Sequence, residues 1–148
     1  MKKFLLVITM LFSLSIMSRD RLDDVMEVLK YVESFNDPSA IGDGGDSYGV
    51  LQIQKACVDD VNRYYKTNYT HGDMFQVECA EEVFKLYAEM GIRRYINKYG
   101  AYPSTEIIVR NHNGGIYSGY RRSTTKKYYR RYLLWKSIIN NKQYVKRY

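Results

Sequence analysis

The spacing of apolar residues along the chain predicts helices. From residue 21 onward they recur every three or four positions, which places them on one face of a helix. These positions are Leu22, Val25, Met26, Leu29 and Val32. Asp20 suits the N-cap, and Asn36-Asp37-Pro38 stops the helix because proline restricts the residue before it. The pattern therefore predicts a first helix from residue 21 to this stop.

Four further segments show helical spacing. They cover about residues 54–65, 75–99 with a break at Gly91, 106–111, and a last helix that starts at Thr124 or Thr125. The predicted inner face of the second helix includes Tyr64. The inner face of the last helix consists of Tyr128, Tyr132, Trp135 and Ile139.

The segment between the first two helices is not helical. Residues 41–46 are rich in glycine and aspartate and predict a tight turn, and residues 47–53 predict a short extended segment. Together they predict one small β-hairpin. The 148 residues suit one domain, and no repeat or linker divides them. We therefore expect a mostly α (α+β) domain over residues 19–148, with five to six helices and one hairpin.

Residues 1–18 have a different composition. Met1-Lys2-Lys3 precedes an uncharged run over residues 4–17, which is shorter than the roughly 20 residues of a membrane span. A basic start followed by a short apolar run is typical of a secretory signal peptide. An uncleaved N-terminal anchor and a buried helix are the alternatives. We expect a secreted or periplasmic protein of the cell envelope.

The two cysteines allow two interpretations. Cys57 and Cys79 lie on consecutive predicted helices, and in an oxidising compartment they could form a disulfide worth about 3 kcal/mol. Two reduced core cysteines fit the pattern equally well. With only His71 and His112 besides, nothing has the ligand pattern of a zinc site. We expect neither a metal nor a cofactor.

Glu33 occupies a position where the periodicity asks for an apolar residue. Steps of three and four along the first helix lead from Leu29 to Glu33, so its carboxyl faces the buried side. Loss of hydration and the negative end of the helix dipole both favour the protonated form. A protonated carboxyl in an apolar pocket is the general acid of glycosidases. The alternative is a helix-end glutamate that bends into water.

The turn after this helix supplies further polar groups. Asp43 and Asp46 bracket two glycines, Gly49 leaves room for a ligand, and Gln52 offers an amide. Taken separately, these residues also fit an ordinary aspartate–glycine hairpin turn, which carries no chemistry.

Two segments resemble the motifs of the lysozyme-like superfamily, nearest to goose-type lysozymes and the soluble lytic transglycosylase domain. The first comprises Glu33-Ser34, Asn36, Pro38, Ala40, Gly42-Asp43, Ser47-Tyr48-Gly49 and Leu51-Gln52-Ile53. The second, Arg110-Asn111-His112-Asn113-Gly114-Gly115, resembles the family's later asparagine–glycine motif. Both occur in the family's order, and the likeness covers about residues 19–135. The resemblance implies a lysozyme-like fold.

The resemblance also implies an activity. Glu33 matches the acid that protonates the β-1,4 glycosidic oxygen between N-acetylmuramic acid and N-acetylglucosamine in peptidoglycan. Asp43 matches the residue that holds the attacking water, and Asp46 is a second candidate for that role. The residues matching the sugar-binding wall are Gln52 and Asn113, with Ser34 and Tyr48 as weaker candidates and His112 at the family's aromatic position.

The chain departs from the family at two positions, and these departures leave alternatives. Gln54 stands where goose-type enzymes have a second aspartate, and His112 replaces the usual aromatic residue. We expect a bacteriolytic muramidase that hydrolyses the bond. The alternatives are a lytic transglycosylase, which leaves 1,6-anhydro ends, and a lysozyme-like protein that binds peptidoglycan without cutting it.

Charge is divided unequally along the chain. Residues 19–92 carry a net charge of −8, and residues 93–148 carry +13, with Glu106 as their single acid. A basic half of this kind attracts anionic polymers, so we expect the basic C-terminal part to bind an anionic cell-wall surface. A solvated helix with an aromatic inner face is the alternative. The acidic first half and the signal segment disfavour nucleic acid, and we expect a monomer.

Overall fold

The structure is a computed structural model that describes residues 21–145, with side chains described as far as residue 142. The expected signal segment, residues 1–18, and the Asp20 N-cap lie outside these residues. In the part of the chain that is described, no helix is both long enough and apolar enough to cross a membrane.

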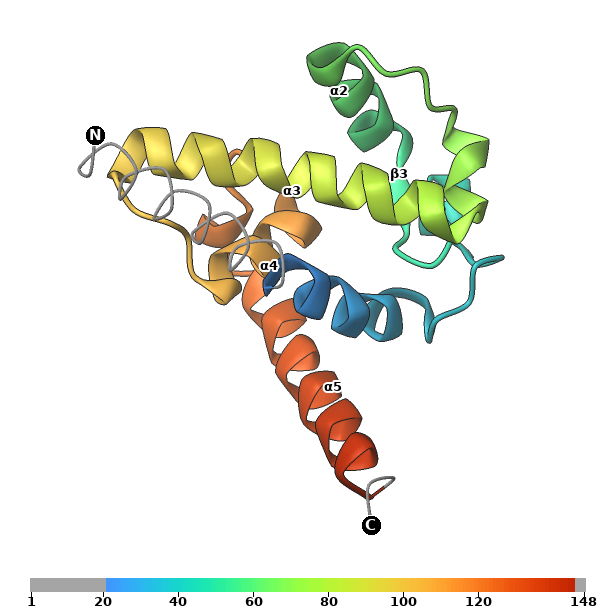
Figure 1. The fold of residues 1–148 in the computed structure, drawn as a ribbon, viewed down its shortest axis with the longest axis vertical. Coiled ribbons are helices and arrows are strands. Elements are labelled where there is room, and N and C mark those ends of the chain that lie inside the picture. Colours follow the sequence, from blue (N-terminus) through green and yellow to red (C-terminus); the bar gives the residue numbers. More distant parts are fainter. Residues whose placement is uncertain (1–20, 146–148) are drawn as a thin grey trace, which may run out of the picture.

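Helices make up most of the described chain (Figure 1). The first helix covers residues 21–34. It is followed by a small sheet and then by α2 (Lys55–Tyr65), α3 (Val77–Tyr99), α4 (Thr105–Gly114) and α5 (Thr125–Val145). Short 3-10 turns lie at η1 (Asp43–Gly45), η2 (His71–Phe75) and η3 (Gly119–Arg121). The predicted mostly helical α+β architecture is confirmed.

The sheet has three short antiparallel strands rather than the two of a hairpin. They are β1 (Ile41–Gly42), β2 (Ser47–Tyr48) and β3 (Ile53–Gln54), in the order β1-β2-β3. The prediction of one extended segment over 47–53 is wrong, because the chain reverses between Gly49 and Gln52. Gly49 has φ +75° and Gln52 has φ +47°. The Gln52 side chain closes this second turn by donating to the carbonyls of Ala40 and Gly49, at 3.1 and 2.9 Å.

The long helix α3 runs through the domain, with α2 on one side and the first helix and α4 on the other (Figure 1). The first helix is joined to α3 by a buried ion pair between Lys30 and Glu81. Side chains from every helix meet in one apolar core. Its most deeply buried members include Leu29, Val61, Val83, Phe84, Val109 and Tyr132.

Two details of the helices differ from the prediction. Helix α3 continues through Gly91, where a Cβ would come within 3.0 Å of Ile116 Cγ2, so this glycine serves close packing rather than a break. Tyr64 is 54% exposed. Its neighbour Tyr65 packs against the core in its place and contacts α3, where its hydroxyl lies 3.4 Å from the Leu86 carbonyl.

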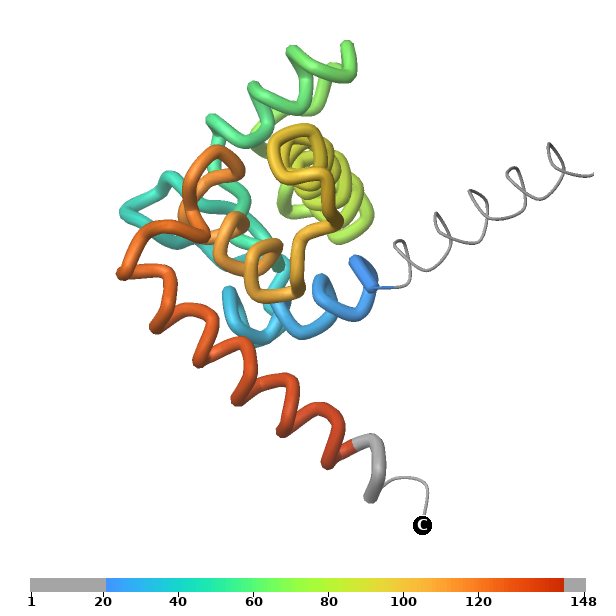
Figure 2. Tube along the Cα trace, turned by 90° about the vertical axis from the view of Figure 1, so that its left-hand side faces the viewer, coloured from blue at the N-terminus to red at the C-terminus, as the bar shows by residue number. Residues whose placement is uncertain are grey.

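Helix α5 packs through its first half and then extends away from the body of the domain (Figure 2). Tyr128 and Tyr132 are buried, and Trp135 stacks on Tyr31 with ring centroids 5.5 Å apart. Trp135 and Ile139 also pack against the core, so the predicted inner face of this helix is confirmed. Leu133 and Leu134, on its other side, are exposed.

A buried arginine joins α4 to the start of α5. Arg110 Nε donates to Thr125 Oγ1 at 2.9 Å, and its Nη1 bonds to Glu106 at 2.7 Å. The Arg110 Nη2 group donates to the Arg122 carbonyl at 3.1 Å, and the Thr125 hydroxyl donates to the carbonyl of Gly119. A buried charge needs such partners to offset its lost hydration. The network therefore holds the chain corner that follows α4 in one arrangement.

Candidate active site

A cleft of about 570 Å³ separates the small sheet from the chain corner at the end of α4. Seven elements contribute to it (η1, β2, β3, α2, α3, α4 and α5), together with the last turn of the first helix. Its lining consists of Glu33, Asp43, Ser47, Gln52, Ile53, Gln54, Ala56, Cys57, Tyr87, His112, Asn113, Gly114, Gly115, Arg122 and Arg131. The cleft thus collects residues from both segments that resemble lysozyme motifs.

Glu33 lies at the end of the first helix, and its carboxyl group lines this cleft. Its side chain is 17% exposed, so it does not bend into open water. Oε1 accepts a hydrogen bond from the Tyr128 hydroxyl at 2.5 Å and lies 3.1 Å from His112 Nε2. Among residues 21–142, no group donates to Oε2. One carboxyl oxygen is therefore held in place, and the other is available to a ligand.

Tyr128 can act only as a donor to Glu33. Burial, followed by the neighbouring Glu33 carboxylate, raises the pKa of Tyr128 well above its ordinary value. The hydroxyl therefore keeps its proton at any physiological pH. The sequence placed Tyr128 on the inner face of the last helix but did not reveal this contact, because 95 positions separate the two residues. A strictly local pattern cannot indicate such a pair.

If the cleft cleaves glycans, as the resemblance implies, replacing Tyr128 with phenylalanine should lower the rate of cleavage about tenfold without changing substrate binding. The ring still fills its buried position, but Glu33 loses the donor that orients its carboxyl group, worth roughly 1.5 kcal/mol. Steady-state kinetics on soluble glycan chains measure this, with Tyr129→Phe as the control on the same helix. An unchanged kcat for Tyr128→Phe would show that the contact does not position Glu33.

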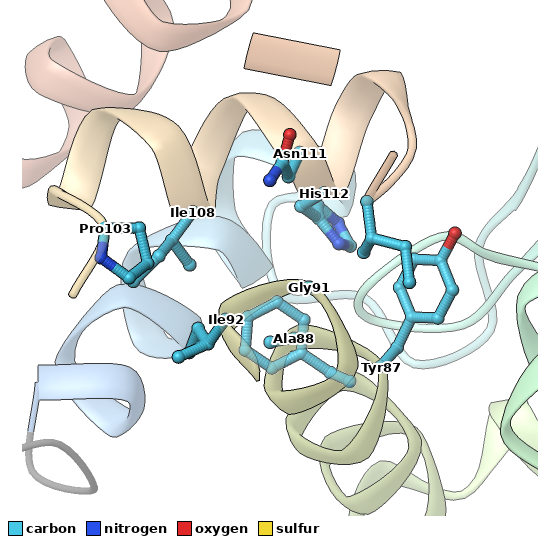
Figure 3. A pocket seen from close by; sticks show the side chains of 10 residues that line it. Tyr87, Ala88, Gly91, Ile92, Pro103, Ile108, Asn111 and His112 are labelled. Carbon is cyan, nitrogen blue, oxygen red and sulfur yellow. The ribbon is translucent and has the colours of Figure 1, made fainter. Parts of the chain in front are cut away.

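His112 takes the place of the aromatic residue expected from the resemblance. Its side chain is 10% exposed and packs edge-on against Phe84, with ring centroids 5.2 Å apart. Behind it, α3 and α4 enclose a cavity of only about 10 Å³, lined by Ile92, Pro103 and Ile108 among others (Figure 3). The helix turn that presents His112 to the cleft therefore rests on tightly packed apolar side chains.

Asp43 is the second carboxylate that lines the cleft. Its Oδ2 accepts hydrogen bonds from Ser47 Oγ at 2.7 Å and from Gln54 Nε2 at 3.3 Å. No described residue donates to its Oδ1. Asp46 does not line the cleft, so the structure does not bring this candidate to the site. The reason is the turn itself, because η1 directs Asp43 toward the cleft and Asp46 follows outside it.

The structure separates the expected sugar-binding residues into two groups. Gln52, His112 and Asn113 line the cleft, although the Gln52 Nε2 group already serves the β2–β3 turn. Ser34 and Tyr48 do not line it, and their side chains make contacts within the fold instead. Ser34 Oγ donates to the Val50 carbonyl at 2.9 Å and ties the first helix to the sheet. Tyr48 stacks on His71 with ring centroids 3.9 Å apart.

Three cleft residues were not indicated by the sequence, namely Tyr87, Arg122 and Arg131, and Gln54 also lines the cleft. Arg131 Nη2 donates to the Val32 carbonyl at 2.5 Å, where it satisfies the end of the first helix next to Glu33. Gln54, at the family's second aspartate position, holds Asp43 rather than acting as an acid. The Arg122 and Arg131 guanidinium groups and the Gln54 amide form a polar wall around the two carboxylates of the cleft.

Cys57 and Cys79 are both free thiols, so the disulfide interpretation is not supported. Cys57 lines the cleft, whereas Cys79 does not, and its Sγ lies 3.9 Å from Gln76 Oε1. Burial raises the pKa of the Cys57 thiol, so it remains protonated and unreactive.

The arrangement brings one sheltered carboxyl group, one hydrogen-bonded aspartate and several amides into one cleft. This combination suits acid catalysis on a polar, uncharged bond better than nucleophilic catalysis by the protonated thiol. No group of three or more histidine, cysteine or acidic side chains suited to a metal ion occurs among the residues that the structure describes. No protein-family model, curated protein or solved structure matches this chain.

Proposed function

We propose that this chain is a peptidoglycan glycosidase of the lysozyme-like superfamily, a muramidase with Glu33 as its general acid. The proposal rests chiefly on the Glu33 carboxyl group, which is sheltered in a cleft with one oxygen held by Tyr128 and the other available. A general acid must stand within hydrogen-bond reach of the oxygen that it protonates. The Oε2 atom is the one that meets this requirement.

The two carboxylates of the cleft have separate roles in this proposal. Glu33 donates its proton to the glycosidic oxygen, the bond to the muramic acid C1 breaks, and the sugar develops oxocarbenium character. Asp43 holds a water molecule through its Oδ1 and accepts the proton released when that water attacks C1. Ser47 and Gln54 keep the Asp43 carboxylate in place during this step.

The lining of the cleft fits a neutral, amide-rich glycan. Gln52, Gln54 and Asn113 present amide groups that can bond the N-acetyl and hydroxyl groups of amino sugars. The glycan backbone is neutral, and Arg122 and Arg131 add positive charge suited to the carboxylates of the peptides that muramic acid carries. Because peptidoglycan lies in the cell envelope, the proposed enzyme would have to be secreted into or beyond the periplasm to reach it.

A lytic transglycosylase is the second candidate, and the amide of Gln54 favours it. The family's second aspartate is absent there, so Asp43 alone would have to hold the water. In a transglycosylase the muramic acid 6-hydroxyl attacks C1 instead and leaves a 1,6-anhydro end.

Digestion of purified peptidoglycan should release muropeptides with reducing ends. Because Asp43 is free to bind water at Oδ1, hydrolysis is expected to exceed transglycosylation. Mass spectrometry after borohydride reduction measures this, since reducing ends gain hydrogen and anhydro ends do not. A product mixture dominated by anhydro-muropeptides would assign the second candidate function.

A further inference from the structure

A cluster of tyrosines and cations lies outside the cleft, where the second half of α3 meets the segment around η3. We call it the tyrosine–cation cluster. It consists of Arg94, Tyr95, Lys98, Tyr99, Tyr117, Tyr120 and Arg121. Part of it borders a hollow of about 50 Å³. The function proposed above uses none of these residues.

Each cation of the cluster lies against a tyrosine ring. The Arg94 guanidinium is 4.5 Å from the Tyr117 ring centroid, and the Lys98 ammonium is 5.3 Å from that of Tyr99. Arg121 lies 5.3 Å from the Tyr120 ring. Contacts of this kind are electrostatic and orient the cations at the surface.

Hydrogen bonds between the hydroxyl groups make the centre of the cluster well ordered. The Tyr99 and Tyr120 hydroxyls are 2.6 Å apart, and Arg121 donates to both, at 2.7 and 2.9 Å. The Tyr120 hydroxyl and then the Arg121 guanidinium hold the pKa of Tyr99 at about 8, below its ordinary value. The hydroxyl groups and the guanidinium therefore form one connected hydrogen-bond network.

No described carboxylate neutralises this charge. The ion pairs among residues 21–142 include none to Arg94, Lys98 or Arg121. Beyond Glu89 the sequence holds a single acid, Glu106, and it is bonded to Arg110. The rings are also accessible, since Tyr99 is 45% and Tyr117 is 57% exposed. Cations that no carboxylate neutralises, beside exposed aromatic rings, can bind an external anion.

We propose that the tyrosine–cation cluster binds an anionic sugar polymer of the cell wall. The tyrosine faces pack against the C–H faces of sugar rings, and Arg94, Lys98 and Arg121 bind carboxylate or phosphate groups. The identity of the polymer rests on the proposed function, whereas the binding itself does not require cleavage. The acidic segment 19–92 disfavours a long nucleic acid at the same surface.

The cluster lies next to the cleft. Asn111 on α4 borders the hollow, and its Oδ1 accepts the Tyr120 backbone N–H at 3.0 Å. The following residues, His112 and Asn113, line the cleft. One turn of α4 therefore contributes to both surfaces, so a polymer bound at the cluster is held close to the cleft.

Sedimentation with insoluble cell walls tests the proposal directly. The full chain carries Glu33→Gln so that no glycan is cut, and the cluster variant adds Arg94→Gln, Lys98→Gln and Arg121→Gln. A matched variant instead adds Lys126→Gln, Lys127→Gln and Arg130→Gln, three exposed cations of α5, and so loses the same charge. The cluster variant should bind walls about tenfold more weakly, and the α5 variant should bind almost as well as the parent.

Two wall preparations distinguish the source of the anion. One retains its covalently attached phosphate-bearing glycopolymer, and the other has been stripped of it with hydrofluoric acid. Cluster-dependent binding that is lost on stripping assigns phosphate groups, and binding that survives assigns the carboxylates of peptidoglycan. Either result supports the proposal.

Three results would overturn it. The first is an equal loss in both triple variants, which would mean that overall charge carries binding. The second is no loss in either variant. The third is cluster-dependent binding to single-stranded DNA that is tighter than to walls. If the triple variant fails to fold by circular dichroism, Tyr117→Ala is compared with Tyr64→Ala, a similarly exposed tyrosine on α2. Because binding is measured in an inactive background, failed catalysis and failed binding remain separate results.

Discussion

Replacing Glu33 with glutamine should reduce peptidoglycan cleavage by about a thousandfold or more while leaving the fold intact. Glutamine has nearly the same shape and can still accept the Tyr128 hydrogen bond at its carbonyl oxygen. It cannot donate an acidic proton to the glycosidic oxygen. A zymogram with embedded cell walls, run beside the wild-type protein, shows the loss as an absent clearing band.

Asp46→Asn provides the matched control, since Asp46 is an acid of the same region that lies outside the cleft. It should clear the gel like the wild type. Equal clearing by wild type and Glu33→Gln would show that another group supplies the proton. If neither the wild type nor Glu33→Gln clears the gel but both proteins sediment with cell walls, the chain is a lysozyme-like protein that binds glycan without cutting it.

Replacing Gly49 with alanine should destabilise the protein by about 3 kcal/mol or more. Two effects combine at this position. Gly49 has φ +75°, which costs any L-residue, and an added Cβ would lie 1.8 Å from the Met74 carbonyl oxygen. The turn must therefore move away from η2, or η2 must move. Thermal or urea unfolding monitored by circular dichroism measures the loss.

Gly44→Ala isolates the contribution of the backbone. Gly44 has a similar φ of +68°, but an added Cβ there meets nothing within 4 Å. We expect it to cost only about 1 kcal/mol, the price of the left-handed conformation. If the two variants were equally stable, the contact between the β2–β3 turn and η2 would not be close. Gly49→Ala should also lower activity, because this turn carries Gln52 into the cleft.

Much of the helical framework could be predicted from local spacing. The first helix, α2, α3 and the start of α5 lie where apolar residues recur every three or four positions. The local stop signal Asn36-Asp37-Pro38 also worked, since the first helix ends at residue 34. These features depend on residues within one or two turns, and a window of sequence contains them completely.

Reasoning from local spacing failed where contacts between residues far apart in the sequence determine the structure. Tyr64 follows the helical spacing but is exposed, because α3 packs against the face that carries Tyr65. Gly91 would interrupt an isolated helix, yet α3 continues through it because Ile116 packs there. The third strand also escaped prediction, since two-residue strands carry too little pattern to distinguish a turn from an extended run.

By itself, the sequence determined the helices, the small sheet region and the unusual position of Glu33 on a buried face, because each depends on neighbours in the chain. Tertiary structure alone decided which groups meet that carboxyl. Tyr128 and His112 contact the carboxyl group, and Asp43 lines the same cleft; the three residues come from three other elements, and nothing in their own segments requires them to meet there. The reason is physical: packing of the core sets distances between elements, and those distances do not appear in any local periodicity.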